Sequence, residues 1–326
     1  MKAPLLQGFA VRWEEHPHRV RALGVDLRAD RLELRCEGGT WANGRFRADR
    51  VRWRASAATL AGAGVHVRTG STPLRLEGSW RLGERDPAQA ARPVELELDA
   101  GLARCEVVGV VLRGFELEAD GRHPPGYTTR SLGAGVGEVR REGARLVFRP
   151  WLRFEAGPVP DRLQQLGAYG SRGEVRWTVV GLERGAATLA HSASLIQGPA
   201  GFSPTRARGD HEARSLSLSG EPGLALAVPA LSGFRVELNP HASGPWPAGR
   251  YLRELEVGVA TRRYDPARGR AELDLEAHFS NSGQVSWATE VEAALEVVLL
   301  QSASGALERA HLAGLLDGAR DELAWL

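Results

Sequence analysis

The sequence is poor in several residue types on which enzymes rely. Lys2 is the only lysine, so an internal Schiff-base lysine, a P-loop lysine and a serine–lysine dyad are all excluded. Met1 is the only methionine and Ile196 the only isoleucine, a bias typical of a GC-rich, bacterial genome. The positive charge is therefore carried almost entirely by arginine.

Cysteine is also scarce. Cys36 and Cys105 are the only two, too few for a disulfide framework, and we predict that both are buried thiols in a reducing compartment. No apolar run approaches the 18 residues of a membrane span, and the first residues lack the apolar stretch of a secretory signal. The sequence therefore predicts no membrane span and a cytoplasmic location.

Several motifs that carry chemistry are missing. There is no His-Glu-x-x-His, no paired cysteine motif, no Asp-rich calcium loop and no Gly-x-Ser-x-Gly. His16-Pro17-His18 offers two imidazoles but no further ligands for a metal. We therefore predict no cofactor, no metal and no catalytic residue. A hydrolase with paired carboxylates from two modules stays open as an alternative, since such a pair leaves no sequence motif.

The net charge is only +2, which gives no reason to expect a nucleic-acid partner. The charge is unevenly distributed, however. Residues 1–80 carry 14 basic against 8 acidic residues, and residues 231–326 carry 9 against 14. This asymmetry is either a chance distribution on a solvated surface or a sign of head-to-tail association.

An internal repeat is the most informative feature that is present. Four landmarks occur three times in the same order: a Gly-Phe pair, an Arg-x-Leu followed by Gly-Val, an alternating strand, and Val-x-Trp. The landmarks begin at Gly8, Arg21, Leu32 and Val51 in the first copy, at Gly114, Arg130, Leu146 and Val175 in the second, and at Gly233, Arg253, Leu273 and Val285 in the third. The repeat predicts three modules, at 1–110, 111–230 and 231–326.

The composition and periodicity favour strands. The chain has 39 glycines and 18 prolines, and residues 94–98 alternate apolar with charged residues. We predict an all-β fold of tandem antiparallel β-sandwich or jelly-roll-like modules, each of about 110 residues. The stretch 306–316 is read as a short C-terminal helix, because its apolar residues follow helical spacing.

Two sets of recurring residues are candidates for a binding surface. A loop with histidine and proline follows each Gly-Phe strand, and an arginine opens the next strand. Exposed aromatic and imidazole groups suit a sugar or a peptide, and arginine suits a carboxylate or phosphate. The candidate ligand-binding residues are His18, His123, Tyr127, His241, Trp246, Tyr251, Arg21, Arg130 and Arg253.

Each candidate also has a structural interpretation. Proline and glycine can shape a turn around solvated histidines, and each arginine can form a structural ion pair. We read Trp53, Trp177 and Trp287 as core residues, with a ligand platform as the alternative. The sequence predicts a non-catalytic protein-binding or assembly protein, with a glycan-binding, lectin-like protein as the alternative.

Overall fold

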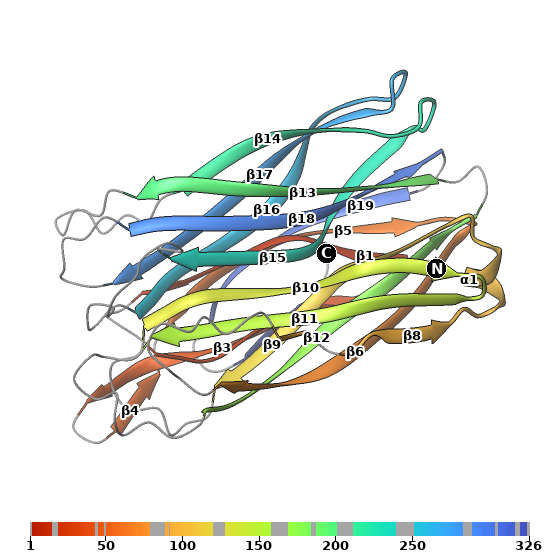
Figure 1. The fold of residues 1–326 in the computed structure, drawn as a ribbon. Coiled ribbons are helices and arrows are strands. Elements are labelled where there is room, and N and C mark those ends of the chain that lie inside the picture. Colours follow the sequence, from red (N-terminus) through yellow and green to blue (C-terminus); the bar gives the residue numbers. More distant parts are fainter. Residues whose placement is uncertain are drawn as a thin grey trace.

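We describe the protein from a computed structural model. The structure describes residues 2–14, 19–42, 45–48, 50–78, 89–90, 92–119, 128–157, 169–183, 187–200, 211–238, 251–282, 289–303, 306–316 and 320–324. These residues form three antiparallel sheets, whose strands run side by side along the long dimension of the molecule (Figure 1). The prediction of an all-β fold is confirmed.

Sheet A has the strand order β14-β17-β16-β1-β5-β19. The bounds of its strands are β14 His211–Ser219, β17 Arg270–Ser282, β16 Tyr251–Asp265, β1 Lys2–Trp13, β5 Val51–Ala61 and β19 Ala306–Leu316.

Sheet B has the strand order β20-β3-β2-β9-β12-β6, and β4 pairs with β3 as well. The bounds of its strands are β20 Arg320–Ala324, β3 Arg31–Ala42, β2 Arg19–Leu27, β9 Val107–Ala119, β12 Tyr169–Leu182, β6 Val65–Gly78 and β4 Arg45–Ala48.

Sheet C has the strand order β13-β18-β15-β10-β11-β7, and β8 also pairs with β11. The bounds of its strands are β13 Ala187–Ala200, β18 Thr289–Ser302, β15 Leu226–Leu238, β10 Thr128–Glu142, β11 Arg145–Gly157, β7 Gln89–Ala90 and β8 Val94–Glu97.

The three sheets are related by a cyclic exchange of strands among the three repeats. In each sheet the Gly-Phe strand (β1, β9 or β15) pairs on one side with a later strand of its own repeat. On the other side it pairs with the second strand of the preceding repeat, the third repeat preceding the first. The remaining repeat contributes an edge strand to each sheet, namely β14 in sheet A, β20 in sheet B and β7 in sheet C. Every sheet therefore contains strands from all three repeats.

This pairing differs from the expected row of tandem sandwiches. The sequence predicted that each module closes into a sandwich or packs on its neighbour, whereas the structure pairs strands of different repeats edge to edge within each sheet. The predicted boundaries at 110/111 and 230/231 fall inside β9 and β15. That each range is a domain stays a prediction.

The phenylalanines of the three Gly-Phe pairs meet in the core. The ring centroids of Phe9, Phe115 and Phe234 lie 5.3 to 5.6 Å apart, with tilted or edge-on planes. All three side chains are buried, and they come from the central strands of three different sheets. This phenylalanine trio holds the three sheets together, since each ring packs on both of the others.

The glycines before Phe9 and Phe115 lie where two neighbouring strands of one sheet approach closely. A Cβ atom on Gly114 would lie 1.9 Å from the carbonyl oxygen of Val25, and one on Gly8 would lie 2.7 Å from the Cα of Gly258. The residue before each glycine is the extra residue of a β-bulge; the three are Gln7, Arg113 and Ser232. The Gly-Phe landmark therefore marks equivalent places in the three sheets.

The predicted C-terminal helix is wrong. Residues 306–316 form strand β19, which pairs with β5 along its whole length from Ala306 to Leu316. Alanine, leucine, glutamate and arginine are good helix formers, but intrinsic propensity is a weak preference that tertiary context overrides, and the edge of β5 offers backbone hydrogen bonds to alternate residues of this segment. Leu312 and Leu316 are buried on one face of this strand.

A single helix is present in the described part of the chain: α1, Ala100–Arg104, which lies at one end of the molecule (Figure 1). Its N-cap is Asp99, whose Oδ1 accepts hydrogen bonds from the backbone N–H groups of Gly101 and Leu102, both at 2.9 Å.

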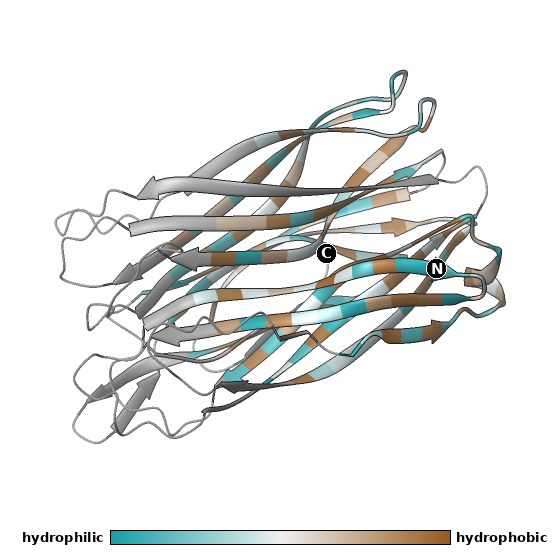
Figure 2. Cartoon of the chain, viewed as in Figure 1, coloured by the Kyte–Doolittle hydropathy of each residue, from teal (hydrophilic) through white to brown (hydrophobic). Residues whose placement is uncertain are grey.

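The period-two pattern of the sequence is visible along the strands, for example in the middle of β10 (Figure 2). Trp53 and Trp177 are buried as expected, whereas Trp287 lies outside the described residues. Their alignment as one landmark is wrong, because Trp53 precedes the partner of Phe9 by two residues and Trp177 follows the partner of Phe115 by two. Both still reach the core, because a shift by an even number keeps the face.

The phenylalanine trio predicts energetic coupling between repeats. Phe115→Leu and Phe234→Leu should each destabilise the protein in urea unfolding, and the double variant should depart from additivity by about 0.5 to 1.5 kcal/mol. Phe148→Leu is the control, since its ring packs on Trp177 at 5.0 Å. Combined with Phe234→Leu it should be additive, and additivity within the trio would show that the rings do not support each other.

Candidate functional site

The residues predicted to bind a ligand are placed only in part. His18, His123, Tyr127, His241 and Trp246 lie outside the described residues. Tyr251 begins strand β16, where it is opposite Ser282, and its side chain is not among those described.

The three recurring arginines occupy equivalent backbone positions. Arg21, Arg130 and Arg253 are each the extra residue of a β-bulge near the start of β2, β10 and β16. A bulge turns a side chain away from the direction that strict alternation would give it. The structure thus gives the arginine landmark a common backbone setting, and a role in binding stays a prediction.

A second feature lies at the glycines of the three Gly-Phe pairs. In each sheet, the residues that lie opposite this glycine on successive neighbouring strands form a line across the sheet, which we call its glycine row. From the register, the row in sheet A is Glu276, Gly258, Gly8, Ser56 and His311. The row in sheet B is Glu33, Asp26, Gly114, Arg176 and Ser71, and the row in sheet C is Trp151, Gly135, Gly233, Glu296 and Ala193.

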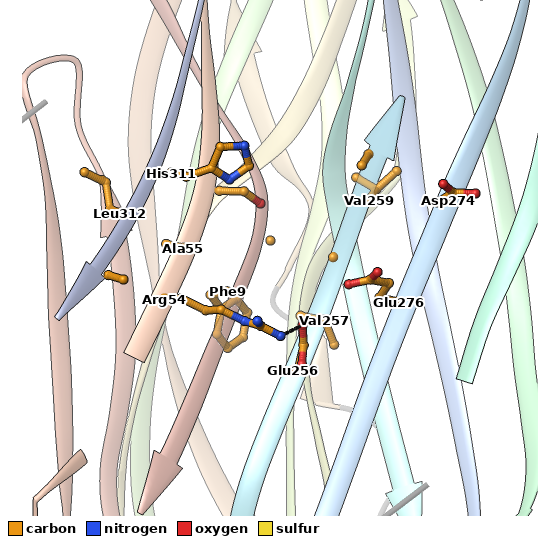
Figure 3. Close-up of a pocket in the computed structure, with 15 residues that line it drawn as sticks. Phe9, Arg54, Ala55, Glu256, Val257, Val259, Asp274, Glu276, His311 and Leu312 are labelled. Atoms are coloured by element: carbon orange, nitrogen blue, oxygen red, sulfur yellow. Dashed lines mark hydrogen bonds and ion pairs between the residues drawn. The ribbon is translucent and has the colours of Figure 1, made fainter. Parts of the chain in front are cut away.

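In sheet A the glycine row forms the floor of an open cavity of about 360 Å³, which we call the trough (Figure 3). Gly8 and Gly258 lie side by side at its centre, and a Cβ atom on Gly258 would meet no other atom within 4 Å. Glu276 and Asp274 project from β17 on one side, and His311 projects from β19 on the other (Figure 3). The trough exists because three adjacent positions of this row carry no side chain larger than that of serine.

An ion pair borders the trough. Arg54 from β5 binds the carboxylate of Glu256 from β16, and both residues face Ala10 of the strand between them. The Arg54 side chain is well exposed, whereas the Glu256 side chain is only 11% exposed. The pair bridges two strands above a small residue and leaves the neighbouring level, at Gly8 and Gly258, uncovered.

In sheet B the equivalent place is filled by the chain's own charged groups. Asp26, with a side chain only 3% exposed, stands where sheet A has Gly258, and Arg176 stands where it has Ser56. The Nε atom of Arg176 lies 3.8 Å from Asp26 Oδ2, and its Nη2 atom lies 2.6 Å from Glu116 Oε2. Arg113, the bulge residue, places its Nε atom 3.4 Å from Asp26 Oδ1.

Burial and pairing shift the pKa values in this network in opposite directions. Desolvation would raise the pKa of Glu116, but hydrogen bonds from Arg35 and Arg176 outweigh it, so the pKa lies below its ordinary value. Desolvation lowers the pKa of Arg113 despite the nearby Asp26. The Glu116 carboxylate is therefore held in its charged form by Arg35 and Arg176.

In sheet C the equivalent place is filled by an aromatic ring. Trp151, which stands where sheet A has Glu276, lies over the two glycines of its row. A Cβ atom on Gly135 would come within 2.8 Å of the indole, and one on Gly233 within 3.2 Å. Glu296 completes this row, and desolvation by burial raises its pKa.

The trough brings a serine next to a histidine. Ser56 and His311 face each other on β5 and β19, and no hydrogen bond joins them. The hydroxyl therefore lacks the contact to a base that would activate it as a nucleophile. Both cysteines are buried as predicted, and burial raises the pKa of each thiol, which disfavours the reactive thiolate.

Within the described ranges, no three His, Cys, Asp or Glu side chains are grouped so that they could hold a metal ion. No helix in that same part of the chain is long and apolar enough for a membrane crossing. No family model, no curated protein and no solved structure matches this chain.

Sequence reasoning missed the trough for a specific reason. Gly8 and Gly258 belong to the first and third repeats, and nothing in the local sequence shows that their strands are neighbours. The recurrence of Gly-Phe was the available signal, because three equivalent glycines can be compared for what covers them.

The ion pairs of sheet B predict an acid-sensitive contribution to stability. Because the folded-state pKa of Glu116 is lowered, its contribution is present above the ordinary carboxyl pKa and is lost as pH falls through the folded value. Glu116→Gln should cost about 1 to 3 kcal/mol in urea unfolding at pH 7 and flatten the loss of stability below about pH 5. Glu276→Gln, on the exposed face of sheet A, is the control; an equal effect of both would contradict the assignment.

Glu296 predicts the opposite sign. Because its folded-state pKa is raised, the stability is full below the ordinary carboxyl pKa and is lost as pH rises through the folded value. Glu296→Gln should therefore raise the melting temperature at pH 7 and leave it unchanged near pH 4. A lower melting temperature at pH 7 would show that the ionised carboxylate is stabilising there.

Proposed function

We propose that this protein is a non-catalytic protein-binding protein, which contacts its partner through the trough on sheet A. The observation that carries the proposal is the difference among three equivalent places: two are filled by the chain's own side chains, and the third is open. Open concave places bounded by a few polar groups are where ligands and partner side chains bind.

The basic and the acidic segments of the sequence lie together in the fold. The basic segment 1–80 and the acidic segment 231–326 share sheets A and B, so their charges meet within one molecule. Lys2 binds Glu308 at 3.0 Å, and Arg54 binds Glu256. Internal pairing therefore accounts for part of the asymmetry that had suggested head-to-tail association.

The lectin-like alternative depends mainly on the predicted His/Pro loops, whose histidines, Tyr127 and Trp246 lie outside the described residues. The hydrolase alternative needs a pair of carboxylates in a cleft with a raised pKa. Glu256, Asp274 and Glu276 share the trough, and the first of these is already paired with Arg54. A side chain of a partner protein would contact the open floor of the trough and the exposed carboxylate of Glu276 at once. Protein binding therefore accounts for more of the features of the trough than the other two functions do.

Filling the trough tests the proposal. Gly258→Val adds a side chain where open space exists, and Gly137→Val does the same in β10 of sheet C, where a Cβ atom also meets nothing within 4 Å. Immobilised wild-type protein and both variants would be incubated with a cell extract, and bound proteins quantified by mass spectrometry. We expect a protein retained by wild type and by Gly137→Val, and reduced at least about tenfold by Gly258→Val, because the added side chain occupies the contact.

Two outcomes would contradict the proposal. One is equal retention by Gly258→Val and wild type. The other is that no protein is retained while sedimentation shows a monomer at every concentration.

A further inference from the structure

Sheets B and C show two kinds of side chain that cover a glycine row. The rows of the three sheets are built at the same level of equivalent strands, beside the phenylalanine trio. In sheet B the space is occupied by guanidinium groups, and in sheet C by an indole. Both are flat groups that can lie on backbone without a side chain.

The charges around the trough select between these two kinds of occupant. It is lined by three carboxylates, Glu256, Asp274 and Glu276, and by one guanidinium, that of Arg54. Arg54 is already bound to Glu256, so the lining has a net charge of −2 when His311 is neutral. Asp274 accepts a hydrogen bond from Ser215 at 3.3 Å, and Glu276 has no partner among the described residues. A neutral ring would leave these carboxylates without a counter-charge, whereas a cation would pair with them.

We infer that the trough on sheet A binds the guanidinium of an arginine side chain presented by a partner protein. The group would lie on the backbone of Gly8 and Gly258, with its edge toward Glu276 and Asp274. It would repeat between two molecules the contact that Arg176 makes with Asp26 inside sheet B. The inference rests on the proposed function and adds the chemistry of the recognised side chain.

The shape of the site explains why arginine is preferred to lysine. A guanidinium is planar and presents several N–H donors along its edge, so it can face two carboxylates while its plane covers the glycines. An ammonium is a compact charge that would meet one carboxylate and leave the floor uncovered. Citrulline has nearly the shape of arginine without its charge, which makes it the matched neutral probe.

Ligand-observed NMR and calorimetry with N-acetyl-arginine amide test the inference directly. We expect saturable binding, at least about tenfold weaker binding of the citrulline amide and weaker binding of the lysine amide. Glu276→Gln should weaken binding of the arginine amide by about two- to fivefold, the range of an exposed ion pair. The control Glu272→Gln, on the same strand but outside the trough, should leave it unchanged. Gly258→Val should abolish it.

Equal affinity for the arginine and citrulline amides, full binding by Gly258→Val, or no binding of the arginine amide at all would overturn the inference. The extract experiment separates this failure from that of the proposed function. If a partner is lost with Gly258→Val but is retained by Glu276→Gln and is not displaced by N-acetyl-arginine amide, the trough binds protein through another group. If the partner elutes with the arginine amide in preference to the lysine amide, both proposals hold; a second copy of this chain as partner would appear as sedimentation of a larger species.

Discussion

The contact of three phenylalanines at the centre of the molecule is the constraint from which the rest of the structure follows. Phe9, Phe115 and Phe234 come from the central strands of three different sheets, and each follows a glycine at which its strand lies against the next strand of its own sheet. The bulge beside each glycine shifts the register between its strand and the next one, and the pairing continues on both sides of the bulge. One recurring dipeptide therefore marks both the contact of the three sheets in the core and the level at which the outer face is bare.

The glycine row is covered differently in the three sheets, and single residues make the difference. Asp26 and Arg176 cover it in sheet B, and Trp151 covers it in sheet C. In sheet A the corresponding residues are Gly258, Ser56 and Glu276, two of which are too small to cover anything. Comparison of the three repeats within one chain thus singles out the trough as the candidate site.

The sequence was a good guide to what is local. The all-β class, the alternation within strands and the burial of Trp53 and Trp177 follow from composition and period two. The Gly-Phe and arginine landmarks also occupy equivalent positions, because both are tied to bulges that recur in the backbone. It was a poor guide to pairing between repeats, since a strand carries no mark of which repeat its neighbour comes from. The same reason explains β19, whose helix-favouring residues are held in a strand by the edge of β5.

The exchange of strands between repeats has a consequence for how the protein is made. β5 is synthesised early, yet its outer edge is paired by β19, and the outer edge of β3 is paired by β20. Sheets A and B therefore lack an edge strand until almost the whole chain has been synthesised. Until then these edges lack their partner strands, and unpaired strand edges are the places where one chain pairs with another during folding.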